Sequence, residues 1–140
     1  MIKKFIAGLG GAIALNLIHE IVRKTDAHAP HVNELGEEAL EKGLRRINRK
    51  INNPEHRNLA TLGADVASNT LYYAATATTA AAPLSGMVAG VATLLLPKYV
   101  GLNPAPVNAS PKKKALTIGY YLAGAMICRY IFRKLDRKVN

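Results

Sequence analysis

The sequence predicts an all-α membrane protein: a bundle of four transmembrane helices, with an amphipathic surface helix between the first and the second. Charged residues gather in three segments and leave four apolar stretches, each near the length that crosses a bilayer. The formal charge is +10, and Lys and Arg flank the apolar stretches, as they do beside anionic lipid headgroups. The chain of 140 residues is expected to form one membrane domain, residues 1–140.

The first predicted membrane helix covers residues 5–22, and its 18 residues would be roughly 27 Å long, just enough to span. Glycine and alanine make its first half thin, which suits close helix contacts. Its charged start and apolar run also fit a signal peptide, but no A-x-A cleavage site follows. A retained membrane helix is therefore expected.

An amphipathic helix is predicted for residues 34–51. Its acidic residues come first and its basic residues last, which suits the helix dipole. The segment from Asn52 to Pro54 is expected to end it. Its apolar stripe has helical spacing and consists of Leu40, Leu44, Ile47 and Ile51. Such a helix either lies on the membrane surface or packs over the bundle.

The second predicted membrane helix, residues 59–82, carries a ladder of polar side chains. Spacings of three and four residues place the ladder on one helical face. Its members are Thr61, Asp65, Ser68, Tyr72, Thr76 and Thr79. Because hydrocarbon cannot form hydrogen bonds, this face is expected to turn toward the interior of the bundle.

The third and fourth membrane helices are predicted at residues 84–100 and 115–132. Gly86 and Gly90 give the third helix a GxxxG face, and Pro97 is expected to kink or end it. The segments on the side of the amphipathic helix contain more Lys and Arg than the two termini, which favours placing those segments in the cytoplasm. The basic residues ahead of the first helix argue for the opposite orientation.

Polar side chains late in the first helix and early in the second are the candidate binding site. Antiparallel helices place these segments at the same depth, whereas Arg129 falls at the opposite membrane face. An isolated Asp65 carboxylate would be costly in apolar surroundings, so it is expected to be protonated, paired or hydrated. The first helix also presents Asn16 on the same face. The predicted binding residues are His19, Glu20, Arg23, Asp65, Asn69 and Tyr72.

Two structural interpretations of these residues remain open. The polar groups of the two helices could simply hold the bundle together, because interhelical hydrogen bonds assist association that lipid cannot drive. Glu20 and Arg23 could form an ion pair at headgroup level, with the Arg23 side chain reaching the interface.

Other kinds of site have little support in the sequence. Asp26, His28, His31 and Glu34 are potential zinc ligands, but they lie in or beside a polar loop with undefined geometry, so no metal is predicted. No cofactor is predicted, and the single cysteine, Cys128, fits a packing role. The absence of GxSxG, HExxH and P-loop motifs favours a protein that is not an enzyme. No nucleic-acid-binding motif accompanies the basic residues.

Four segments together resemble a group of uncharacterised small bacterial membrane proteins with four helices. They are ALNLIHEIVR from Ala14, APHVNELG from Ala29, DVASNTLYY from Asp65 and YLAG from Tyr121. The resemblance implies a multi-pass protein of the bacterial inner (cytoplasmic) membrane. It implies no activity, because none is known for that group.

Three functions are compatible with the sequence. The first is a structural or accessory membrane protein that binds partner helices or lipid, as a homo-oligomer or within a larger complex. The second is a small oligomeric transporter or channel in which Asp65 or Glu20 binds a proton or cation. The third, with the least support, is a lipid-modifying enzyme that uses His19 and Asp65. A water-soluble helical bundle is a further alternative, since no stretch is uniformly apolar over 20 residues.

Overall fold

The computed structural model describes residues 1–137, and every regular element in that range is helical. The all-α prediction is therefore confirmed. In chain order the elements are α1 (Ile2–Thr25), α2 (Val32–Arg46), α3 (Pro54–Thr76), α4 (Ala82–Leu95), a 3-10 turn η1 (Pro97–Val100), α5 (Ala105–Asn108) and α6 (Pro111–Arg137).

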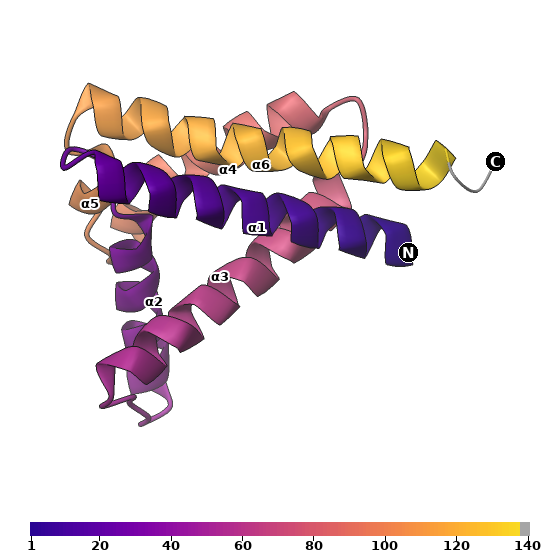
Figure 1. The fold of residues 1–140 in the computed structure, drawn as a ribbon. Helices are drawn as coiled ribbons and strands as arrows, with labels where there is room; N and C mark the ends of the chain where they lie inside the picture. The colour runs from indigo at the N-terminus through magenta and orange to yellow at the C-terminus, as the bar shows by residue number, and fades with distance from the viewer. Residues whose placement is uncertain (138–140) are drawn as a thin grey trace.

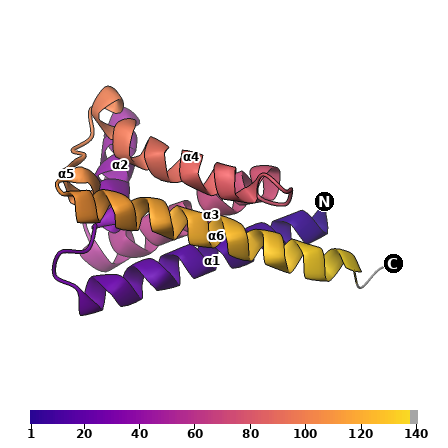
Figure 2. The same cartoon turned by 90° about the horizontal axis from the view of Figure 1, so that it is seen from above.

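The long helices α1 and α6 lie side by side and run antiparallel, so the start of α1 and the end of α6 are at one end of the molecule (Figure 1). Lys3 and Asp136 form an ion pair of 3.0 Å at that end. Helix α4 packs along α6, and α3 crosses α1 obliquely (Figures 1 and 2). Helix α2 lies across the opposite end, so that α1, α2 and α3 form the three sides of a triangle (Figure 1).

Small residues form the contacts between the long helices, whereas large apolar residues point outward. On α1, Ala7, Gly8, Gly11 and Ala12 are buried. A Cβ atom at Gly8 would lie only 2.5 Å from the Thr70 carbonyl oxygen of α3. The exposed face of the same helix carries Ile2, Ile6, Leu9, Ile13, Leu17 and Ile21. This distribution is typical of helices that contact one another through small residues and contact lipid through large ones.

The predicted close contacts of the GxxxG face are confirmed, and the partner is α6. A Cβ atom at Gly86 would lie 2.7 Å from the Leu122 Cα, and one at Gly90 would lie 2.7 Å from the Ile118 Cα. The backbones of α4 and α6 therefore approach too closely for any larger residue at either position.

The structure corrects the predicted helix ends. Helix α3 begins at Pro54 because the Asn53 side chain accepts hydrogen bonds from the Glu55 and His56 backbone amides and proline suits the first helical position. It ends at Thr76, so the prediction of a helix to residue 82 was wrong and Thr79 lies beyond the helix.

The amphipathic helix is shorter than predicted. Helix α2 ends at Arg46, and Asn48 follows with a positive φ of 54°, a left-handed conformation that stops the helix. The predicted stripe therefore fails at its end, where Ile47 is 67% exposed. The buried apolar residue of α2 is instead Leu35, which packs with Leu94 and Val107. The third predicted helix also ends early, at Leu95, before η1 begins at Pro97.

Within residues 1–137, two helices are long and apolar enough to cross a membrane: α1, which has 24 residues, and α6, which has 27. Helix α4 is apolar but has 14 residues, about 21 Å at the α-helical rise. Helix α3 has 23 residues, yet the polar side chains on it keep it out of this class. The predicted bundle of four transmembrane helices is therefore not confirmed.

Candidate functional site

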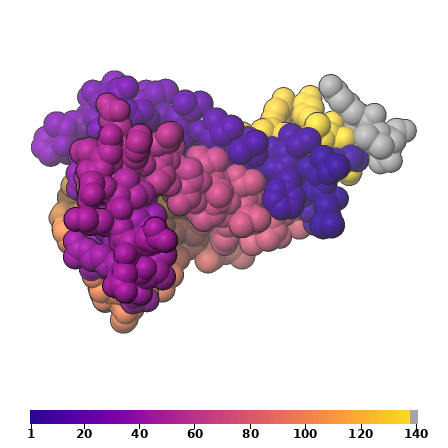
Figure 3. Space-filling view, turned by 90° about the horizontal axis from the view of Figure 1, so that it is seen from below, coloured from indigo at the N-terminus to yellow at the C-terminus, as the bar shows by residue number. Residues whose placement is uncertain are grey.

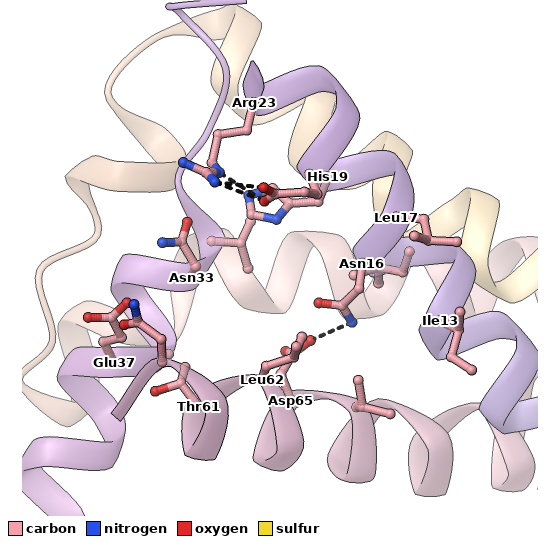
Figure 4. A pocket seen from close by; sticks show the side chains of 16 residues that line it. Ile13, Asn16, Leu17, His19, Arg23, Asn33, Glu37, Thr61, Leu62 and Asp65 are labelled. Atoms are coloured by element: carbon pink, nitrogen blue, oxygen red, sulfur yellow. Dashed lines mark hydrogen bonds and ion pairs between the residues drawn. The ribbon is translucent and has the colours of Figure 1, made fainter. Parts of the chain in front are cut away.

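A cavity of about 470 Å³ lies inside the triangle of α1, α2 and α3 (Figure 4). In the space-filling view, the purple and magenta atoms of α2 and α3 lie at the front of the molecule, on the left (Figure 3). The polar residues that line the cavity are Asn16, His19, Glu20, Arg23, Asn33, Glu37, Asn58, Thr61 and Asp65. The apolar residues are Ile13, Leu15, Leu17, Val32, Leu62 and Val66.

Asp65 is held by two side-chain amides. The Asn16 amide nitrogen of α1 donates to its Oδ2 over 2.8 Å, and the Asn69 amide nitrogen, one turn along α3, donates to its Oδ1 over 3.0 Å. None of the ion pairs found within residues 1–137 involves Asp65. Its carboxylate therefore faces the cavity with neutral hydrogen-bond partners and no cation.

Glu20 and Arg23 form a bidentate pair at the end of the cavity. The Arg23 Nη2 lies 2.8 Å from the Glu20 Oε1, and the Arg23 Nε lies 3.1 Å from the Glu20 Oε2. Lys24 adds a second ion pair to Glu20 at 3.3 Å. Because the Arg23 guanidinium forms its ion pair with Glu20, it does not neutralise Asp65.

His19 connects α1 to the segment that leads into α2. Its Nε2 lies 3.2 Å from the Pro30 carbonyl oxygen, and its ring meets the Tyr120 ring edge-on with centroids 5.6 Å apart. The side chain is buried and lines the cavity. His19 thus fixes the position of the α1–α2 connection.

The structure brings together four of the six predicted binding residues around one cavity: His19, Glu20, Arg23 and Asp65. Asn69 joins them through its bond to Asp65. Tyr72 does not, because its hydroxyl donates to the Ser85 carbonyl oxygen of α4 over 2.8 Å. The depth argument against Arg129 agrees with its position, since its guanidinium reaches the Ala80 carbonyl oxygen instead.

Sequence reasoning missed the direct partner of Asp65 on α1. Asn16 shares a face with His19, but its position one turn earlier was not distinguished from the rest of that face. It also missed the α2 wall, to which Asn33 and Glu37 belong. Gly36 is the local signal for that wall, because a Cβ there would lie 2.9 Å from the Thr61 Cγ2 of α3.

The polar ladder of α3 does not turn inward as a unit. Ser68 is exposed, and its hydroxyl bonds to the backbone of its own helix. The buried polar residues of α3 are Thr61, Asn69, Thr70 and Tyr73. Tyr73 is fully buried and donates to the Tyr121 carbonyl oxygen over 2.9 Å, so this large side chain sets which face of α3 meets the bundle.

Two buried oxygen atoms of cavity-lining residues have no hydrogen-bond partner: the Thr61 Oγ1 and the Asn33 Oδ1. Thr61 is only 6% exposed. Buried polar groups are nearly always satisfied in proteins, so these two oxygens are unmet acceptors in the wall of the cavity.

The residues weighed as zinc ligands lie in separate ion pairs. His31 lies 3.0 Å from Glu34, and Asp26 pairs with Lys112 at the start of α6. The pKa of Asp26 is held below its ordinary value mainly by the hydrogen bond from Lys112 and, to a smaller extent, by the hydrogen bond from the His28 backbone amide. No group of three or more potential ligands meets in the part of the chain that the structure describes.

The chain matches no family model, no curated protein and no solved structure. The class that the fold itself defines is an all-helical protein with two helices long and apolar enough to cross a membrane. The resemblance to small bacterial four-helix membrane proteins stays a prediction.

Proposed function

We propose that this protein is a multi-pass membrane protein of accessory type that holds a lipid or another amphiphile between α1, α2 and α3. The observation that carries the proposal is the continuity of two surfaces. The partly polar cavity shares Leu62 and Val66 with an apolar groove that runs between α1 and α3. That groove is also lined by Phe5, Leu9, Leu59 and Leu71. A polar head and an apolar chain would each find a matching surface.

The outer surface supports a membrane location. Large apolar side chains are exposed along all of α1, and α4 adds Leu84, Met87, Val88, Val91 and Leu95. Water-soluble monomers rarely expose apolar surfaces of this extent. We place α1, α3, α4 and α6 in the bilayer of a bacterial inner membrane, with α2 in the headgroup layer. Arg45 and Arg46 in the last turn of α2 would then contact anionic headgroups.

Cysteine accessibility tests this topology. In a Cys128→Ser background, single cysteines at Lys3, Ala80, Arg49 and Ala109 would be treated with a membrane-impermeant maleimide on intact cells and on inverted vesicles. Four spans predict that Lys3→Cys and Ala80→Cys react from one side, and Arg49→Cys and Ala109→Cys from the other. If Ala80→Cys reacts together with Arg49→Cys, only α1 and α6 span.

Native mass spectrometry of the purified protein tests the ligand site. Leu62→Trp would fill the point where cavity and groove meet, whereas Leu84→Trp adds the same bulk on the exposed face of α4. The proposal predicts loss of a retained amphiphile in Leu62→Trp and its retention in Leu84→Trp. Equal retention in both variants, or none in the unaltered protein, would refute a cavity-bound amphiphile.

A second candidate is cation or proton transport, and the observation that favours it is the absence of a cationic partner for Asp65 among residues 1–137. In proteoliposomes, Asp65→Asn would then abolish flux and leave assembly intact. An Asp65→Asn protein that only assembles less well would instead support a purely structural role. The enzyme hypothesis gains no such observation, since His19 and Asp65 each bond to other groups.

A further inference from the structure

We propose that the polar end of the cavity binds a primary ammonium group, so that the ligand is a long-chain amine or another amphiphile with a free amino head. This inference rests on the proposed function, because it specifies the headgroup of the amphiphile in the same cavity. It requires Asp65 as the counter-ion, and it excludes anionic headgroups from this site.

The charges around the cavity carry the first step. Among its lining residues are three carboxylates, on Glu20, Glu37 and Asp65, and one guanidinium, on Arg23. Arg23 is bonded to Glu20, and Glu37 has Arg57 at 3.6 Å. Asp65 is the carboxylate that remains without a cation. A charge in apolar surroundings is stabilised when an opposite charge reaches it, so a cationic group is the complement.

The hydrogen-bond inventory carries the second step. The Thr61 Oγ1 and the Asn33 Oδ1 are buried and unpartnered, and both can accept. The Asn16 amide nitrogen donates to both Ala12 and Asp65, which leaves its oxygen as a further acceptor at the cavity (Figure 4). An ammonium group has three donors and no acceptor, which fits a site rich in acceptors. A phosphate or carboxylate head would place a second negative charge beside the Asp65 carboxylate, whose hydrogen-bond partners are neutral amides.

The position of the apolar groove carries the third step. Leu62 lies on α3 beside Asp65 and faces the same space (Figure 4). Leu62 and Val66 continue into the groove toward Phe5 and Leu9 of α1. An alkyl chain attached to an ammonium group at Asp65 would therefore leave the cavity along this groove and remain in apolar surroundings.

Binding of chain-matched amphiphiles to the full-length protein in a neutral maltoside detergent tests the inference. Dodecylamine carries the ammonium group, N-dodecylacetamide has the same chain without the charge, and dodecyl phosphate carries the opposite charge. We expect dodecylamine to bind at least about tenfold more tightly than either competitor, the size of effect that a desolvated charge pair can supply. Dodecyltrimethylammonium, which has the charge but no N–H donor, should bind more weakly than dodecylamine.

Variants assign the preference to the cavity. Asp65→Asn should remove the tenfold preference for dodecylamine over N-dodecylacetamide. Asp136→Asn, a matched loss of charge beside Lys3 at the far end of the bundle, should leave it unchanged. Thr61→Val keeps the side-chain shape and removes one acceptor, so it should weaken dodecylamine binding several-fold and leave N-dodecylacetamide binding unchanged.

The outcomes separate this inference from the proposed function. Equal binding of all the amphiphiles, blocked by Leu62→Trp, would overturn the ammonium preference and leave the amphiphile site standing. Tighter binding of dodecyl phosphate would overturn it as well. No binding of any amphiphile would overturn both proposals. If Asp65→Asn does not fold, an unchanged preference in Thr61→Val would still contradict the inference.

Discussion

The Asn16 Nδ2 of α1 lies 2.8 Å from the Asp65 Oδ2 of α3, and this hydrogen bond joins the two helices at the wall of the cavity. The same nitrogen donates to the Ala12 carbonyl oxygen over 3.0 Å, so both of its hydrogens are used. The amide therefore has one orientation, and Asp65 is held by a residue whose own rotamer is fixed. The pair gives the cavity a carboxylate in a defined position.

Replacing Asn16 with leucine should destabilise the protein. Asp65 would lose one of its two amide donors while remaining partly buried, which costs about 1 kcal/mol. The free energy of unfolding in detergent–lipid micelles measures the effect. Asn52→Leu, at an exposed position between α2 and α3, is the control. Equal stability of the two variants would mean that the Asn16–Asp65 bond contributes nothing.

Glycine substitutions on α6 test the contact with Tyr73. A Cβ atom at Gly124 would lie 2.5 Å from the Tyr73 hydroxyl oxygen, so Gly124→Ala should destabilise the protein by about 1–3 kcal/mol through overpacking. At Gly119, on the same helix, nothing lies within 4 Å, and Gly119→Ala should stabilise it by about 0.5–1 kcal/mol. Thermal unfolding of the two alanine variants measures this difference in stability. Equal unfolding temperatures would contradict a tight contact between Gly124 and Tyr73.

Thr61→Val should stabilise the ligand-free protein. The hydroxyl is buried without a partner, and valine keeps the shape of the side chain while it removes that unsatisfied group. A gain of about 1 kcal/mol in the free energy of unfolding is expected. The measurement requires protein stripped of amphiphiles, since a bound amine would satisfy the hydroxyl. A loss of stability on substitution would show that this oxygen has a partner in the free protein.

The Asp26–Lys112 pair should make stability depend on pH at the acidic end. Lys112 holds the pKa of Asp26 below its ordinary value of 3.8, so the pair favours folding above that pH. Its contribution is lost as the pH falls through the lowered pKa, when the folded protein must also bind the proton. The difference in stability between the unaltered protein and Asp26→Asn, followed from pH 6 downward, should shrink toward zero below this range. Lys112→Gln should weaken the same pH dependence, and the hydrogen bond from the His28 backbone amide to Asp26 should preserve part of it.

Much of the helical framework could be predicted from sequence because its signals are local. Apolar periodicity and the small residues at Gly86 and Gly90 act through neighbouring residues or through the helix that carries them. The same is true of the shared depth of Asp65 and the late part of α1, which follows from antiparallel helices. These signals placed Asp65 opposite the correct helix. The Asn53 cap is also a local signal, but the prediction used this segment only to end the preceding helix and began the next one at residue 59.

The predicted partners and helix ends failed where the signal was not local. The prediction of a network through His19 did not anticipate that its ring would be bonded to Pro30. The pairing of Arg23 with Glu20 was one of the interpretations that the sequence left open. Likewise, the length of the apolar stretch after Thr76 suggested a continuous helix to residue 82, but the chain turns there into α4. Both the bonding partners of these side chains and the turn after Thr76 depend on how separate helices pack together, which no single segment of sequence encodes.

The sequence by itself determined an all-helical chain with thin contact faces and a polar group at Asp65. Only the tertiary structure decided that Asn16 is the partner of Asp65 and that α2 closes the cavity. The physical reason is the rotation of α3. Tyr73 fits where Gly11 and Gly124 leave space and donates to the Tyr121 carbonyl oxygen, and this packing fixes which face of α3 meets α1.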